Sequence, residues 1–211
     1  LKQQNRKLLT KDLKKVAFNN EKGKKALALI VDLIRKYKVM PGDVNYDAAQ
    51  TLFVTGQSGM HINGVWGTGA YEKIEGLNFG AAPFPRIFDK RVTWTDSHTL
   101  VFPVQRKMDK EKLKAGVTFV TWMIDHGAMW SKAGHIPTSK KVLESAKFKA
   151  MKYRPDYAAS AWFAKYVPPT PRWGEIEDEL VDQIERAVAG KMSVEKVLNK
   201  AEMKVNSILA R

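Results

Sequence analysis

The first strong pattern in this chain is a stripe of apolar positions with the spacing of an amphipathic helix. The stripe consists of Leu27, Ile30, Val31 and Ile34, which follow the i, i+3, i+4, i+7 pattern. Asn19 or Asn20 can cap the start of this helix, and Pro41-Gly42 ends it. Residues 47–54 are predicted to form a short second helix, which leads into a turn at 56–59.

Three more helices are predicted in the second half of the chain. Asp109 can cap one whose stripe contains Leu113, Val117, Val120, Met123 and Ile124 and which ends at Gly127. Two helices close the chain, with Gly190 between them and Ser193 as the N-cap of the last. Their apolar stripes are Ile176, Leu180, Val181, Ile184 and Val188, followed by Val194, Val197, Leu198, Ala201, Val205, Ile208 and Leu209.

Short apolar runs between these helices predict strands. Residues 60–64 alternate like a half-buried strand, and further strands are predicted at 79–82, 92–94 and 100–102. Prolines directly after the second and fourth of these runs end them. Strands that alternate with helices favour an α/β layer architecture.

Composition agrees with a folded chain and excludes several classes. Of its 211 residues, 44% are hydrophobic and 27% charged, which is ordinary globular usage. No apolar run approaches the length of a membrane span. The absence of cysteine excludes disulfides, thiolate catalysis and cysteine-based zinc sites. The N-terminus has no initiator Met, apolar signal core or lipidated cysteine, and is interpreted as a cut in a longer chain.

The formal charge of +14 raises the question of nucleic-acid binding. Residues 1–40 hold 12 Lys and Arg against 3 Asp and Glu. These lysines alternate with the first helical stripe, which favours a solvated helix face. The alternative is a basic nucleic-acid-binding module, whose affinity would fall steeply with salt.

Catalytic and metal-binding signatures are missing from the sequence. The four histidines, His61, His98, His126 and His135, have no helical metal-ligand spacing, so no metal and no other cofactor is expected. A glycosidase needs two carboxylates, and the one suggestive acid, Asp96, is interpreted as bonding to its loop neighbours. We therefore expect no enzyme. A carbohydrate-active enzyme is the second alternative, beside the nucleic-acid-binding module.

Aromatic residues give the most informative chemistry. The chain has six tryptophans, and Trp66, Trp94 and Trp173 are predicted on loops or strand ends. Gly64, Gly67 and Gly69 surround Trp66, so its ring is expected to have little cover. An exposed indole can stack on the C–H face of a sugar ring while polar neighbours bind the hydroxyls. Trp122, by contrast, lies within a helical stripe and is interpreted as packing or partial exposure.

One segment resembles a known family. Residues 56–66, Gly-Gln-Ser-Gly-Met-His-Ile-Asn-Gly-Val-Trp, are similar to the small-Gly-x-x-Ala-Met-x-Ile-x-Gly-x-Trp segment of family 1 extracellular solute-binding proteins, the maltose-binding-protein-like receptors. Gly59 stands where the family usually has Ala. Segments 78–85, 95–103 and 130–137 resemble further family segments in the same order.

This resemblance implies an α/β, periplasmic-binding-protein-like (type II) architecture of two lobes with a sugar in the cleft between them. Residues 1–82 and 127–211 would belong to the C-terminal lobe, and 83–126 would return to the N-terminal lobe. The chain would be the C-terminal half of the receptor, and the missing N-terminal half of the same receptor would be its first partner.

The resemblance also implies the function. The chain would be the sugar-binding component of an ABC importer, extracytoplasmic, in the periplasm or as a membrane-anchored lipoprotein, and its other partners would be a sugar or oligosaccharide and the transmembrane subunits of the permease. No nucleic acid would be bound. The ligand-binding residues implied are Trp66, Trp94, Asp96, Ser97, His98 and Trp173.

Overall fold

The computed structural model describes residues 1–43 and 45–211, and their contacts group the chain into two units. The first unit consists of Leu1–Ala48, Pro85–Thr95 and Ala164–Arg211. The second unit consists of Ala49–Phe84 and Asp96–Phe163. These two units reflect only the contacts within this chain. The assignment of residues 1–82 and 127–211 to one receptor lobe and of 83–126 to the other therefore remains a prediction.

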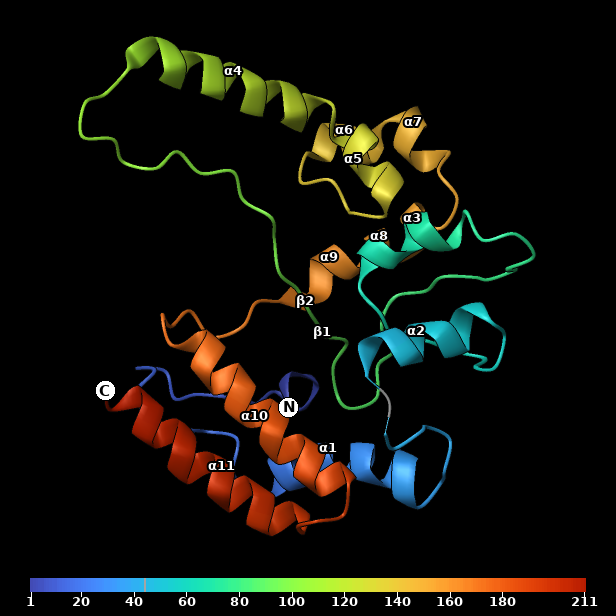
Figure 1. Ribbon diagram of the computed structural model, residues 1–211, viewed down its shortest axis with the longest axis vertical. Coiled ribbons are helices and arrows are strands. Elements are labelled where there is room, and N and C mark those ends of the chain that lie inside the picture. The colour runs from blue at the N-terminus through green and yellow to red at the C-terminus, as the bar shows by residue number, and fades with distance from the viewer. Residues whose placement is uncertain (44) are drawn as a thin grey trace. The chain divides into compact units, whose positions relative to one another are not determined.

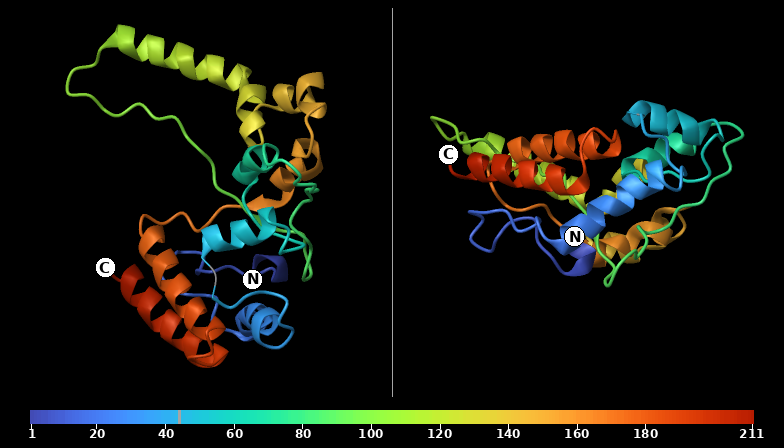
Figure 2. Two further views of the ribbon diagram at one scale, coloured as in Figure 1. Left: turned by 45° about the vertical axis from the view of Figure 1, so that its right-hand side comes forward. Right: turned by 90° about the horizontal axis from the view of Figure 1, so that it is seen from below.

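Three long helices form most of the first unit, after a short 3-10 helix η1 (Lys2–Gln4). They are α1 (Glu21–Arg35), α10 (Trp173–Val188) and α11 (Val194–Leu209), which pack side by side (Figures 1 and 2). All three are confirmed as helices. The Asn20 side chain caps α1 by accepting hydrogen bonds from Lys22 N and Gly23 N.

The connection between α10 and α11 also follows the predicted signals. Gly190 has a φ of 70°, the left-handed conformation that favours glycine, and lies two residues beyond the last residue of α10. Ser193 accepts a hydrogen bond from Lys196 N as the N-cap of α11. The two local signals together fix the turn between the helices.

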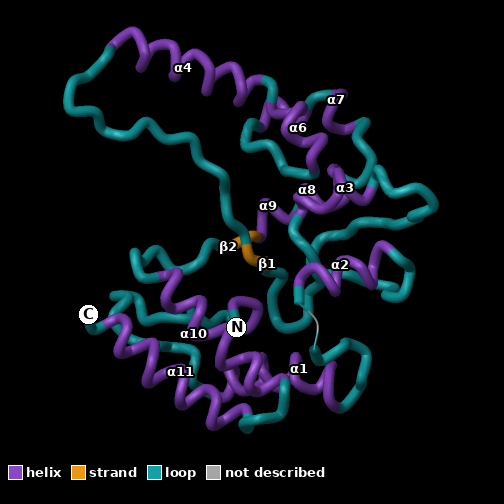
Figure 3. The backbone as a smooth tube through the Cα atoms, in the orientation of Figure 1, coloured by secondary structure: helices purple, strands orange, loops and turns teal. Residues whose placement is uncertain are grey.

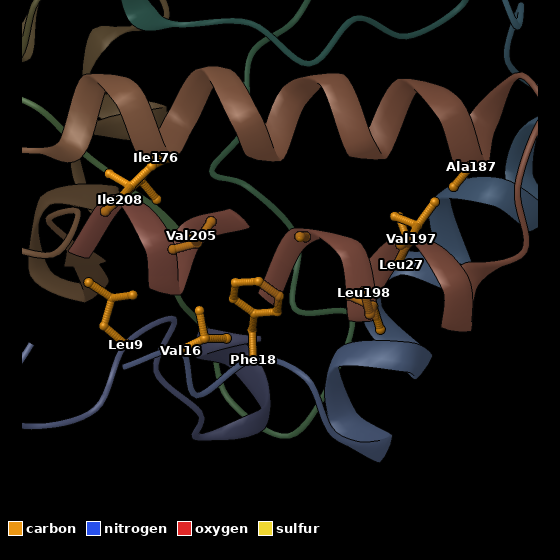
Figure 4. Close-up of a cluster of buried hydrophobic side chains, with 11 residues drawn as sticks. Leu9, Val16, Phe18, Leu27, Ile176, Ala187, Val197, Leu198, Val205 and Ile208 are labelled. Carbon is orange, nitrogen blue, oxygen red and sulfur yellow. The ribbon is translucent and has the colours of Figure 1, made fainter. Parts of the chain in front are cut away.

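The core of the first unit joins the N-terminal segment to the closing helices. Leu9, Val16 and Phe18 are buried although they belong to no helix, and Figure 4 shows them beside α11. The remaining members of this cluster are Leu27, Ile176, Ala187, Val197, Leu198, Ala201, Val205 and Ile208. The apolar stripes of α1, α10 and α11 therefore face a shared core.

Strands are scarce in the described part of the chain (Figure 3). In the first unit β1 (Thr93–Trp94) pairs in parallel with β2 (Ala164–Lys165). The strands predicted at 60–64, 79–82 and 100–102 are wrong for this structure, because these residues have no strand conformation. A strand needs a neighbour for its backbone N–H and C=O groups, and no other described strand runs beside them.

The second unit consists of one 16-residue helix together with short helices and turns. The helix α2 (Tyr46–Val54) begins in the first unit's range and continues into the second, which confirms the short helix predicted at 47–54. The remaining elements are η2 (Val65–Gly67), α3 (Thr68–Tyr71), α4 (Lys110–Asp125), α5 (Gly127–Trp130), η3 (Ser131–Ala133), α6 (Lys140–Glu144), α7 (Ala146–Lys149), α8 (Arg154–Ala158) and α9 (Ser160–Phe163).

The helix α4 is confirmed with its Asp109 cap, which accepts a hydrogen bond from Lys112 N. However, none of its residues is buried, and Val117 and Ile124 of the predicted stripe are half exposed. Figure 1 shows α4 at the end of a long extended segment, and a Cβ on Gly116 of this helix would lie 2.5 Å from a ring carbon of Phe102 in that segment. Nor is any helix among the described residues both long and apolar enough to cross a membrane.

Candidate functional site

The turn that carries Trp66 is built around an unusual side-chain position. Trp66 lies in η2 and is 47% exposed, which confirms the predicted exposed turn. Its ring lies over Gly64, where an added Cβ would be 2.1 Å from two ring carbons. Only glycine leaves room for the ring in this position. The indole therefore lies against the Gly64 backbone with nearly half of its surface exposed, which is an arrangement suited to a stacking platform.

A second backbone segment packs against this turn. It is the 131–134 turn, which consists of η3 and Gly134, where φ is 114°. A Cβ on Gly134 would lie 1.9 Å from Val65 O, and one on Gly69 would lie 2.7 Å from Lys132 O. The two backbones thus touch on both sides of Trp66, once before it and once after it.

The segment leading into Trp66 is anchored by a polar network. Asn63 Nδ2 donates a hydrogen bond to Tyr71 Oη at 2.7 Å, and Tyr71 Oη lies 3.2 Å from His61 Nδ1. Burial lowers the pKa of His61, which favours the neutral ring that can accept this hydrogen bond. Phe53 of α2 packs beside Tyr71, with ring centroids 5.5 Å apart.

Three more aromatic side chains meet beside the 131–134 turn. His135 stacks on Trp130 with centroids 5.2 Å apart, and the His98 ring lies 5.0 Å from His135 and 5.9 Å from Trp130. Burial, and secondly the neighbouring His98, lowers the pKa of His135. Such a group of indole and imidazole rings offers both a stacking face and hydrogen-bonding nitrogens.

The structure brings together part of the predicted ligand-binding set. His98 belongs to this aromatic group. Trp66 lies in the segment whose backbone, at Val65 and Gly69, contacts the 131–134 turn. Asp96 and Ser97 are exposed, and the Asp96 carboxylate accepts a hydrogen bond from Ser97 N at 2.7 Å. This local bond agrees with the loop-neighbour interpretation of Asp96.

Two predicted residues belong to the first unit. Trp94 is exposed in β1, as expected for a strand end. Trp173 was predicted on a loop, but it is the first residue of α10 and packs against the core of the first unit. The Pro-rich run before Trp173 favoured a loop in the sequence analysis, because prolines mark irregular segments and do not show where the next helix begins.

Sequence reasoning did not single out Trp130 and His135, whose rings contact His98. Both lie in the Trp-Ser-Lys-Ala-Gly-His-Ile-Pro segment, which was used only as a mark of resemblance. The signal that could have found them is the combination of two aromatic side chains with a glycine turn between them. Among residues 1–43 and 45–211 no group of three or more His, Cys, Asp or Glu side chains could hold a metal ion.

Comparison with known proteins identifies the class. Over 98% of this chain, the fold matches 53% of the cyclic alpha-maltosyl-1,6-maltose binding protein from Arthrobacter globiformis, with 27% identity and a TM-score of 0.74. It also matches 54% of the sugar-binding protein MalE from Xanthomonas citri, over 99% of this chain, with 19% identity and a TM-score of 0.80. The architecture is therefore that of part of a type II periplasmic-binding-protein-like receptor.

The family follows from the sequence itself. Residues 2–156 match the bacterial extracellular solute-binding proteins, and the chain belongs to this family. A maltotriose-binding protein from Pyrococcus abyssi is 24% identical over 142 residues, which are 65% of this chain and 31% of that protein. The chain thus spans about half the length of the solved relatives and a third of this curated one.

Proposed function

We propose that this chain is the C-terminal half of a carbohydrate-binding receptor of an ABC importer, which captures a sugar and delivers it to the membrane permease. The observation that carries the proposal is Trp66, whose ring lies against Gly64 with nearly half of its surface open. The receptor is non-catalytic and needs no cofactor, in keeping with a family of solute-binding proteins. The family also supports an extracytoplasmic location, in the periplasm or on a lipid anchor.

The first ligands to test are oligosaccharides of α-linked glucose. The relatives include proteins named for binding maltotriose and cyclic alpha-maltosyl-1,6-maltose, one structure in complex with cycloalternan and one that holds tagatose. An indole face suits the apolar side of a glucose ring. Maltotriose is the simplest of these probes.

The ligand-binding residues we propose centre on Trp66 and His98. We add Trp130 and His135 to this proposal, because both rings contact His98. The remaining residues implied by the family resemblance stay predictions, and they are Trp94, Asp96, Ser97 and Trp173. The nucleic-acid-binding alternative gains no support from the relatives, which are named as sugar or solute receptors.

Another part of the same receptor would complete the site. The chain covers only about half of each solved relative, and Val117, Trp122 and Ile124 of α4 are about half exposed. An N-terminal half that packs on α4 and beside residues 100–102 would bury these side chains and would offer backbone partners to residues 100–102, which have no strand conformation in this structure. The permease would then contact the complete receptor.

Replacing Trp66 tests the proposed function. In calorimetry or NMR titrations with maltotriose, Trp66→Ala should cost about 1–3 kcal/mol of affinity, with aromatic stacking on bases as the guide to the size. The melting temperature should change little, since the side chain is half exposed. Trp162→Ala is the matched control, because Trp162 lies in the same unit and is 73% exposed. Normal affinity in Trp66→Ala would remove this residue from the site.

A second prediction concerns the other half of the receptor. This chain alone should bind maltotriose far more weakly than the longer polypeptide encoded by its reading frame, because a ligand in a cleft gains contacts from both lobes. Calorimetry on the two proteins under the same conditions measures the difference. Equal affinities would show that the sugar is not held between two lobes.

A further inference from the structure

We propose that the short helix α8 positions Trp66 for its ligand, through Arg154 and Tyr157, which hold the 131–134 turn against the Trp66 turn. The inference rests on the proposed function, because it concerns the same sugar-stacking side chain. Neither residue contacts a ligand in this account, so both are positioning residues. The contacts that support the proposal all lie within the second unit.

Arg154 is the most deeply buried charged side chain of the second unit's described residues, with 3% exposure. Its Nε donates to Ser131 O at 2.9 Å, and its Nη2 donates to Lys132 O at 2.6 Å. Its Nη1 donates to Lys152 O at 3.0 Å and lies 2.5 Å from a carboxylate oxygen of Glu72. A buried guanidinium with this many partners is held in one place.

Glu72 links the Arg154 contacts to the segment that contains Trp66. Glu72 directly follows α3, and α3 directly follows the η2 turn that contains Trp66. The guanidinium therefore joins the Trp66 side of the contact to the 131–134 turn. Lysine could not replace it fully, because a single ammonium lacks the planar fork that serves several acceptors at fixed angles.

Tyr157 makes the second connection. It lies three residues after Arg154, so the two side chains share a face of α8. Its hydroxyl donates a hydrogen bond to Gly134 O, and Gly134 is the residue that touches Val65 O. Burial raises the pKa of Tyr157, so the hydroxyl keeps the proton that it donates.

The two connections act on the backbone at both sides of Trp66. The 131–134 turn contacts Val65 before the indole and Gly69 after it, and Arg154 and Tyr157 fix three carbonyl groups of that turn. When the turn is fixed, the Trp66 backbone has little freedom and the ring is pre-organised for stacking. A pre-organised side chain loses less entropy when a ligand binds.

The test compares two variants of α8 with a matched control. Tyr157→Phe removes only the hydroxyl, and Arg154→Lys keeps the charge but loses the fork. Tyr153→Phe removes a hydroxyl from an equally buried tyrosine that instead stacks on Phe79. The readout is the indole N–H resonance of Trp66 in the ¹⁵N-labelled chain, assigned with Trp66→Phe and followed during maltotriose titration below each melting temperature.

We expect the Trp66 resonance to shift or split in both α8 variants and to stay in place in the control. Maltotriose affinity should fall roughly tenfold in Arg154→Lys, which corresponds to about 1.4 kcal/mol, and less in Tyr157→Phe. If Arg154→Lys does not fold, Tyr157→Phe decides alone. Lower melting temperatures with an unchanged Trp66 resonance and unchanged affinity would mean that α8 only stabilises the fold, and would overturn the proposal.

Failure of the proposed function would look different. Maltotriose would then leave the Trp66 resonance of the unsubstituted chain unchanged at saturating concentration. The effect of Tyr157→Phe on that resonance without sugar would still decide whether α8 positions the indole.

Discussion

At the scale of single residues, the orientation of Trp66 depends on the absence of a side chain at Gly64. The backbone of Gly64 has a φ of −73° and ψ of 156°, which any residue can adopt. The requirement for glycine therefore comes from the ring and not from the backbone. The sequence indicated an exposed turn here, but it could not show which glycine lies under the indole.

Substitution of Gly64 by alanine should displace the indole. The added methyl would overlap the ring, so we expect maltotriose affinity to fall by about 1 kcal/mol or more, the lower end of a stacking contribution. Gly59→Ala is the control, since a Cβ there meets nothing within 4 Å. Titration calorimetry on both variants measures the effect. Equal affinities for Gly64→Ala and Gly59→Ala would contradict this account of the ring.

At the scale of elements, capping decides where the long helices begin. The Asn20, Asp109 and Ser193 side chains each accept hydrogen bonds from backbone N–H groups in the first turn of their helix. These bonds join residues two or three positions apart, so the sequence predicts them well. By contrast, strand pairing joins distant residues, and three predicted strands did not form.

The cap of α1 gives a measurable stability contribution. Asn20→Ala should lower the free energy of unfolding by about 1 kcal/mol, because two N–H groups lose their acceptor. Asn20→Asp should retain most of this stability, since its carboxylate still accepts from both groups near the positive end of the helix. Denaturant unfolding of the three proteins compares them. A stability of Asn20→Ala equal to that of the unsubstituted chain would show that the cap contributes nothing.

At the scale of the whole molecule, the formal charge of +14 is the feature most open to misinterpretation. Several of the N-terminal lysines have local partners: Lys24 lies 3.1 Å from a Glu21 oxygen and 3.7 Å from a Glu195 oxygen, and Lys22 Nζ donates to Gln4 O. Lys14, Lys15 and Lys25 are exposed. These contacts fit a solvated face with structural ion pairs.

The salt dependence of affinity therefore distinguishes sugar binding from nucleic-acid binding. Maltotriose is uncharged, so its affinity should hardly change between about 50 and 200 mM salt, whereas binding driven by phosphate contacts would fall by orders of magnitude. Neutral substitution of Lys14, Lys15 and Lys25 should likewise leave sugar affinity unchanged. A steep loss of sugar affinity in either experiment would place these lysines at the ligand.

The sequence by itself determined the features that depend on near neighbours along the chain. Helix positions follow from apolar spacing and from capping residues such as Asn20, and the exposed turn at Trp66 follows from its glycines. Colinear motifs with a family resemblance predicted the receptor fold, which the solved relatives confirm. These signals are local because helical hydrogen bonds and caps join residues no more than four positions apart.

Only the tertiary structure decided which distant segments meet. It placed His98 beside Trp130 and His135, packed the 131–134 turn against Val65, and buried Arg154 between that turn and Glu72. It also showed α4 without a buried residue, although its apolar spacing predicts a core helix. Apolar spacing shows that a face can be buried, but the partner that buries it is a matter of contacts between segments far apart in the chain.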